Sequence, residues 1–396
     1  MAIVDRWLLP DGVEDVLPPQ AKKLEEVRRR LLDLFETWGY DYVIPPMIEY
    51  IDSLLTGTGH DLDLKTFKIV DLLTGRTMGV RADITPQVAR IDAHSLNRAG
   101  VARLCYAGTV VQAQADRMLA SRTPLSVGAE LFGESNGTAD VEIVSLMVEA
   151  LKSLEVDTIH VDLGDVAIFR QLMDSLALSA DQQELLFDAV QKKAVAEIKS
   201  RCTQFDLSTG DTHMLCALPG LTGDATVLTR ARELFVGHKG ILASIDNLEQ
   251  VSVVIAERFK DLIVYFDLSE LRGYAYHTGI VFAAYVEGSG RVVAKGGRYD
   301  FVGQVFGRGN RSATGFSVDV RMLAEEVAMK AADRKIVLVS NTPGGKNKEL
   351  WQEIQRLRQS GYIVLESGEG TEYDYELVFN NNEWQLNSGH GEMNNG

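Results

Sequence analysis

The chain has 396 residues, 45% of them hydrophobic, and a formal net charge of −16. This acidity disfavours tRNA binding, which depends on clustered Lys and Arg. No apolar run reaches the ~20 residues that a membrane span needs, so no membrane contact is expected. Cys105, Cys202 and Cys216 show neither paired nor metal-ligand spacing, and the N-terminus has no signal-peptide pattern. We therefore expect a cytoplasmic protein with no bound metal.

The N-terminal two thirds of the chain alternate between helical and strand-like patterns. Gln20–Trp38 has apolar residues spaced by three and four, which predicts an amphipathic helix. Asp140–Leu154 predicts a second helix, and it leads into the strand-like Thr158–Leu163. A mainly helical pattern then runs from 165 to 260, and Leu262–Leu268 resumes the sheet. Such clusters of strands with helices to one side predict an α+β fold.

The C-terminal segment predicts a small α/β module. Lys335–Ser340, Tyr362–Glu366 and Tyr375–Phe379 are strand-like, and Lys348–Ser360 has a helical apolar stripe. The residues after Trp384 are rich in Asn, Gly and Glu, a composition typical of disorder. The predicted organisation is a core of residues 1–164 and 261–328, a helical insert at 165–260, a module at 335–386 and a disordered tail at 387–396.

Several segments, in order along the chain, resemble the signature motifs of class II aminoacyl-tRNA synthetases, and of the histidyl-tRNA synthetases in particular. They are Leu9–Pro18, Gly39–Glu49 (motif 1, with Pro46), Arg81–Pro86, Leu104–Gly133 (motif 2), Leu271–Phe282, Gly296–Asp300 and Thr314–Leu323 (motif 3). The resemblance reaches about Glu326. It implies an antiparallel class II sheet flanked by helices and a homodimer formed through motif 1. The C-terminal module is too small for the usual anticodon-binding domain.

The positions that hold ATP in the synthetases have changed. The motif 2 core, Phe-Arg-x-Glu, falls on Val111–Gln114, so Gln112 replaces the Arg and Gln114 replaces the Glu. The motif 3 Arg position falls on Met322, and Arg321 lies one residue earlier, about 100° away around a helix. A neutral amide cannot replace a guanidinium on a phosphate. These changes predict lost adenylation chemistry, and no cofactor is expected.

The amino-acid pocket, in contrast, resembles the family pattern. The resemblance implies that Asp83 and Glu130 would hold an ammonium and an imidazole, and that Arg272 would hold a carboxylate. Further pocket positions that it implies are Thr85, Tyr276, His277, Gly296 and Gly297. Ala275 and His277 depart from the family motif. Taken alone, Asp83 could be a helix N-cap, Arg272 a surface residue, His277 a structural group and Gly296–Gly297 a bulge.

Because its ATP-binding positions are altered and its C-terminal module is short, the chain resembles the regulatory subunits of short-form ATP phosphoribosyltransferase, a family of synthetase paralogues. This implies a non-catalytic partner that activates the catalytic subunit in the first step of histidine biosynthesis, with histidine as feedback effector. A divergent histidyl-tRNA synthetase and a stand-alone amino-acid-binding paralogue remain alternatives.

Overall fold

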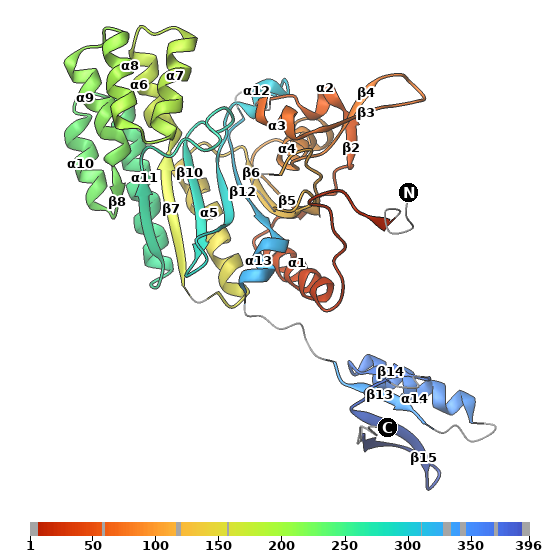
Figure 1. Ribbon diagram of the computed structural model, residues 1–396. Coiled ribbons are helices and arrows are strands. Elements are labelled where there is room, and N and C mark those ends of the chain that lie inside the picture. The colour runs from red at the N-terminus through yellow and green to blue at the C-terminus, as the bar shows by residue number, and fades with distance from the viewer. Residues whose placement is uncertain are drawn as a thin grey trace. The chain divides into compact units, whose positions relative to one another are not determined.

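The computed structural model describes residues 7–57, 60–115, 120–156, 158–309, 311–327, 334–340, 346–367 and 371–389. The chain divides into two compact units, Met1–Met329 and Lys330–Gly396 (Figure 1). Each unit has hydrophobic side chains buried in a core of its own.

A nine-stranded sheet forms the centre of the first unit, in the order β1-β5-β6-β12-β11-β10-β7-β9-β8. Its strands are β1 (Asp41–Tyr42), β5 (Ala102–Thr109), β6 (Leu125–Phe132), β7 (Ile159–Asp165), β8 (Thr222–Gly223), β9 (Ile263–Asp267), β10 (Ile280–Val286), β11 (Val292–Arg298) and β12 (Ala313–Asp319). Among these strands, the pairs β1–β5 and β7–β9 are parallel and the others are antiparallel. The prediction of an α+β fold is confirmed.

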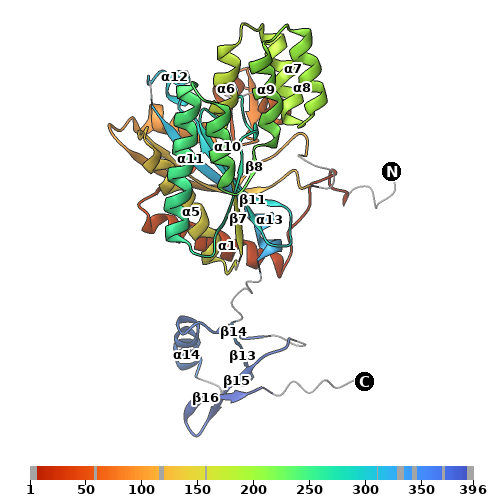
Figure 2. The ribbon, with the colours of Figure 1, turned by 90° about the vertical axis from the view of Figure 1, so that its left-hand side faces the viewer.

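Helices α1 (Gln20–Thr37), α5 (Gly137–Ser153) and α11 (Lys239–Arg258) pack against the sheet (Figures 1 and 2). Apolar side chains of α1 and α5, including Phe35 and Leu146, are fully buried in the main core. The Asn136 side chain accepts a hydrogen bond from Thr138 N over 3.0 Å and caps α5, as short polar side chains commonly do at a helix start. The helices predicted at 20–38 and 140–154 therefore form.

The segment predicted as a helical insert contains five further helices. They are α6 (Val166–Ser175), α7 (Ala180–Gln191), α8 (Val195–Gln204), α9 (Thr209–Ala217) and α10 (Thr226–Leu234), with a short 3₁₀ turn at Leu218–Gly220. Helix α11 ends the segment and contacts both α5 and β7. Its buried side chains, such as Ile245 and Leu248, belong to the same core as the sheet. The insert is thus packed on the sheet rather than folded around a separate core.

A smaller sheet, β2-β4-β3, lies beside the large one. Its strands are β2 (Ile48–Tyr50), β3 (Phe67–Val70) and β4 (Thr77–Val80), and the neighbouring helices are α2 (Ile51–Leu54), α3 (His60–Lys65), α4 (Thr85–Arg90), the π-helix Ile91–Leu96 and α12 (Val302–Val305). Arg90 binds Glu49 over 2.5 Å, which ties α4 to the end of motif 1. Helix α13 (Val320–Glu326) follows β12 and packs on α1.

The second unit has a four-stranded sheet, β14-β13-β15-β16, with one described helix, α14 (Asn347–Gln359). The strands are β13 (Ile336–Val339), β14 (Ile363–Leu365), β15 (Tyr375–Asn380) and β16 (Glu383–Ser388). The expected start of a disordered tail at 387 is wrong, because β16 pairs with β15 as far as Ser388. Residues 390–396 of that predicted tail lie outside the described part of the chain.

Candidate effector pocket

A row of glycines across the large sheet opens the floor of a cavity. Reading across the strands, Glu130 is opposite Gly315, Gly315 opposite Gly297, Gly297 opposite Val281, and Val281 opposite Gly164. Paired residues in neighbouring strands point to the same face of a sheet. Three side chains are therefore missing along one line next to Glu130, which lets the groups that line the cavity lie directly on the sheet.

The glycines are required by what lies above them. A Cβ atom at Gly315 would overlap the Glu130 carboxylate, and one at Gly297 would lie 2.8 Å from Nδ1 of His277. At Gly164 a Cβ atom would lie 2.6 Å from the Asp267 carbonyl oxygen. Contacts this short are not accommodated without a shift of backbone or buried side chains.

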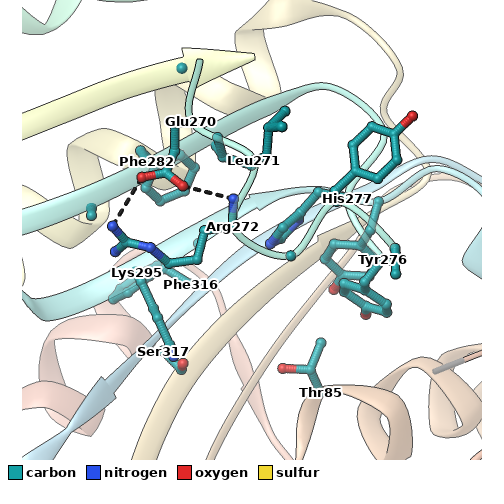
Figure 3. Close-up of a pocket in the computed structure, with 18 of the residues that line it drawn as sticks. Thr85, Glu270, Leu271, Arg272, Tyr276, His277, Phe282, Lys295, Phe316 and Ser317 are labelled. Carbon is teal, nitrogen blue, oxygen red and sulfur yellow. Dashed lines mark hydrogen bonds and ion pairs between the residues drawn. The ribbon is translucent and has the colours of Figure 1, made fainter. Parts of the chain in front are cut away.

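The cavity has a volume of about 710 Å³, and Figure 3 shows part of its lining. Seven of the eight residues predicted for the amino-acid pocket line it, namely Asp83, Thr85, Glu130, Arg272, Tyr276, His277 and Gly296. The eighth, Gly297, lies beneath the His277 ring. The sequence-based set is thus brought together in one place.

Glu130 is the most deeply buried acid of the cavity, with 1% of its surface exposed. Its Oε1 accepts hydrogen bonds from Thr85 Oγ1 over 3.0 Å and from the Tyr106 hydroxyl over 3.3 Å, and its Oε2 accepts one from the Tyr299 hydroxyl over 2.5 Å. Burial raises the pKa of Glu130 to about 8, although the hydroxyl donors act in the opposite direction. The raised pKa reflects a buried carboxyl group with no cation beside it, and a cationic group of a ligand could take that place.

Asp83 lies just before α4 and is only partly buried. Its Oδ1 accepts hydrogen bonds from the backbone N–H groups of Ile84 over 2.6 Å and Thr85 over 3.2 Å. The N-cap position of α4 belongs to Ile84, so Asp83 stands one residue earlier, and it also lines the cavity. The helix-start and ligand interpretations are compatible.

Aromatic rings form the wall above Glu130. Tyr276 stacks on Tyr299 with centroids 4.8 Å apart, and His277 packs edge-on against Tyr276 at 5.5 Å. Burial lowers the pKa of His277 to about 4, so this ring is neutral at physiological pH. His277 thus acts as a neutral wall between Gly273 and Gly297, in line with a structural role.

Arg272 lines the same cavity but turns toward another acid. Its backbone N–H donates to Glu270 Oε1 over 2.7 Å, and its Nη2 donates to Glu270 Oε2 over 2.9 Å. In Figure 3 this pair lies on one side of the view, and Thr85 and Tyr276 lie on the other. Arg272 is thus in the cavity lining as predicted, and its guanidinium is held by a neighbour two residues away.

Charges along the cavity are mostly negative. Its lining includes seven acids, Asp83, Glu130, Asp162, Glu184, Asp188, Asp267 and Glu270, against the three bases Lys65, Arg272 and Lys295. A lining of this kind attracts ammonium groups and repels a triphosphate.

The helical insert holds the loop that carries His277. Arg170, on α6, donates through Nη2 to the carbonyl oxygens of Tyr274 over 2.8 Å and His277 over 3.0 Å. The Tyr274 ring lies 5.1 Å from Phe187 of α7 and 5.6 Å from Phe169 of α6. The loop is thus fastened to two helices of the insert.

None of the altered ATP positions is among the residues that line the cavity. The Gln112 backbone N–H and carbonyl bind Arg122 over 2.8 and 2.9 Å, and Met322 lies on α13. Arg321 bonds to Ser121 Oγ over 2.8 Å and to Glu14 over 2.8 Å. As its offset from the family position predicts, Arg321 points away from the cavity. Within the described residues, no cluster of His, Cys, Asp and Glu is arranged as a metal site.

Three residues that contribute to the site were missed from the sequence. Tyr106 and Tyr299 donate to Glu130, and Glu270 holds Arg272. Tyr299 could have been found, because it lies two residues after Gly297 in a segment that matches the family motif, and thus on the same face.

The chain also matches known proteins. A model of the histidyl-tRNA synthetase family matches residues 12–323. The ATP phosphoribosyltransferase regulatory subunit of Pseudomonas syringae pv. syringae is 46% identical over 98% of this chain and 99% of its own length. The chain belongs to the family of ATP phosphoribosyltransferase regulatory subunits.

Solved structures share the fold of this chain. A Bacillus halodurans protein described as an ATP phosphoribosyltransferase regulatory subunit/histidyl-tRNA synthetase has a TM-score of 0.80 and 27% identity, over 91% of this chain and 92% of that one. A chain of an ATP phosphoribosyltransferase complex from Thermotoga maritima shares the fold, with a TM-score of 0.59 and 16% identity over 77% and 98% of the two chains. Among the described residues of this chain, no helix is both long enough and apolar enough to cross a membrane.

Proposed function

We propose that this chain assembles in the cytoplasm with the short-form catalytic subunit of ATP phosphoribosyltransferase, raises its activity and makes it sensitive to histidine. The names of its close relatives support the first part of the proposal. The second part rests on one observation: the cavity keeps an acidic, hydroxyl-rich end around Glu130, while the altered ATP positions lie outside its lining.

Histidine matches the chemistry of this cavity. Asp83 would supply negative charge for the ammonium group, Glu130 would be a hydrogen-bond partner for the imidazole, and Thr85 and Tyr276 form walls. Arg272 is within the same lining and would bind the carboxylate. Docking on the catalytic subunit would favour its active conformation, and histidine would shift that equilibrium in proportion to its preference for one state.

The test is a phosphoribosyltransferase assay on the catalytic subunit, with and without this chain, repeated with histidine. We expect the chain to raise the rate and histidine to lower it again. Asp83→Ala should weaken the inhibition and leave complex formation intact, because the Asp83 side chain bonds only to its own helix start. An unchanged rate on adding the chain would refute the proposed function.

The match to the histidyl-tRNA synthetase model favours one further candidate, a divergent synthetase. A synthetase would catalyse histidine-dependent exchange of pyrophosphate into ATP, and exchange at high protein concentration would support it. For a stand-alone amino-acid sensor, we would expect histidine binding with no phosphoribosyltransferase recovered in a pull-down from the source cell.

A homodimer through motif 1 is part of the proposal. Tyr42, Ile44, Met47 and Ile48 are apolar and exposed, with 76% of the surface of Ile44 accessible. Exposed apolar residues gathered in one segment are typical of an interface. Sedimentation analysis of Ile44→Asp should show dissociation to monomers, and a wild-type monomer would refute the dimer.

A further inference from the structure

Glu270 neutralises the one arginine in the cavity lining. Both oxygens of its carboxylate are used, one on the Arg272 backbone N–H and the other on the guanidinium. The dashed lines in Figure 3 mark these two contacts, in which the side chain of Arg272 folds back over its own loop. Arg272 is therefore already paired with a carboxylate before any ligand enters.

Further groups favour the same position of Arg272. Burial disfavours its charged form, but the Glu270 charge, the Tyr285 hydroxyl and Asp162 outweigh burial and raise the pKa of Arg272. On the sheet, Asp162 is paired with Ala283, two residues from Tyr285, so both side chains point to the face that carries the cavity. Arg272 thus interacts with Glu270, Tyr285 and Asp162, and Glu270 lies with it on the side of Figure 3 away from Thr85 and Tyr276.

We propose that Glu270 competes with the carboxylate of a bound amino acid for Arg272, and that this competition sets the affinity and the carboxylate selectivity of the cavity. The inference rests on the proposed function, in which histidine binds here. A ligand carboxylate replaces Glu270 on the guanidinium, so one carboxylate–guanidinium contact is exchanged for another. Glu270 is therefore a positioning residue, acting through Arg272.

The substitution Glu270→Gln tests the competition without removing the loop contact. The amide oxygen of Gln can still accept from the Arg272 backbone N–H, whereas the charge that retains the guanidinium is lost. Arg272 becomes available to the ligand. The pair is partly exposed, with 49% and 28% of the two side chains accessible, so we expect histidine to bind about threefold to tenfold more tightly.

Two ligands and one matched variant separate this effect from a general change in charge. Histamine has the imidazole and the ammonium group of histidine but no carboxylate, so Glu270→Gln should not tighten its binding. Glu184→Gln removes the same charge from the α7 wall of the cavity, where no contact with Arg272 is present. It should give no gain that is specific for histidine.

Titration calorimetry of the full chain with each ligand gives the measurement. A rise in the ratio of histidine to histamine affinity in Glu270→Gln alone supports the inference. An unchanged or lower ratio, or the same gain in Glu184→Gln, overturns it while leaving histidine binding intact. If neither wild type nor Glu270→Gln binds histidine, the proposed effector pocket falls together with the inference.

Discussion

The Tyr299 hydroxyl lies 2.5 Å from Oε2 of Glu130, and both side chains are buried in the floor of the cavity. Thr85 and Tyr106 bind the other oxygen. Three neutral donors thus surround a carboxyl group with no guanidinium or ammonium against it. Burial without a counter-charge favours the protonated form of Glu130. The pH dependence of the free energy of unfolding should reveal this protonation.

Glu130→Gln should change how stability depends on pH. The pKa of Glu130 is about 8 in the folded chain and 4.5 without its surroundings. The folded state therefore retains the proton over this range, and Glu130 lowers the free energy of unfolding as pH rises from about 4.5 to 8. Relative to wild type, the variant should gain on the order of 4 kcal/mol between pH 5 and pH 8.5. Urea unfolding at both pH values measures it, and parallel profiles would contradict it.

Gly315→Ala should abolish ligand binding. Its Cβ atom would overlap the Glu130 carboxylate, which cannot move without breaking its bond to Tyr299. Overpacking of this kind costs about 1–3 kcal/mol of stability. Gly220→Ala is a matched control, because nothing lies within 4 Å of the added atom. Equal histidine binding by the two variants, measured by calorimetry, would disprove the role of the glycine row.

Arg298 should be essential to the fold rather than to binding. It binds Asp140 over 2.9 Å, and both side chains are buried. Arg298→Ala leaves the Asp140 charge unpaired and should cost about 3 kcal/mol in urea unfolding. Combining it with Asp140→Asn should recover part of that loss, since the buried charge is removed. A double variant less stable than Arg298→Ala would contradict this account.

Arg321→Ala should leave histidine binding unchanged. Its guanidinium joins α13 to Ser121 and Glu14, so the expected effect is a loss of about 1 kcal/mol of stability. Thermal unfolding and calorimetry distinguish the two roles. A large loss of histidine affinity at constant stability would show that this arginine serves the cavity after all.

The sequence predicted the elements whose pattern is local. Gln20–Thr37 and Gly137–Ser153 form helices where the apolar spacing placed them. Strand β16 was missed because its Asn- and Glu-containing sequence is typical of disorder, whereas Trp384 and Leu386 alternate inward and pack on the core of the second unit. Pairing with β15 overrides the local composition.

The site was predicted only as far as motif positions extend. Asp83, Thr85, Glu130 and Tyr276 do line one cavity. Cross-strand register, which puts Gly164 in line with Gly297 and Gly315, depends on the assembled sheet and has no signature along the chain. The contact between Glu270 and Arg272 was not predicted for a similar reason, since it follows from how the loop folds back.

The hydrogen bonds from Arg170 to the carbonyl oxygens of Tyr274 and His277 couple helix α6 to the wall of the cavity. Because one guanidinium binds both ends of the segment 274–277, a tilt of α6 must either move this segment of the cavity wall, which carries His277, or break both hydrogen bonds. A protein that binds to the outer surface of α6 would thereby change the shape of the cavity. A ligand that fills the cavity would in turn restrict the movement of α6.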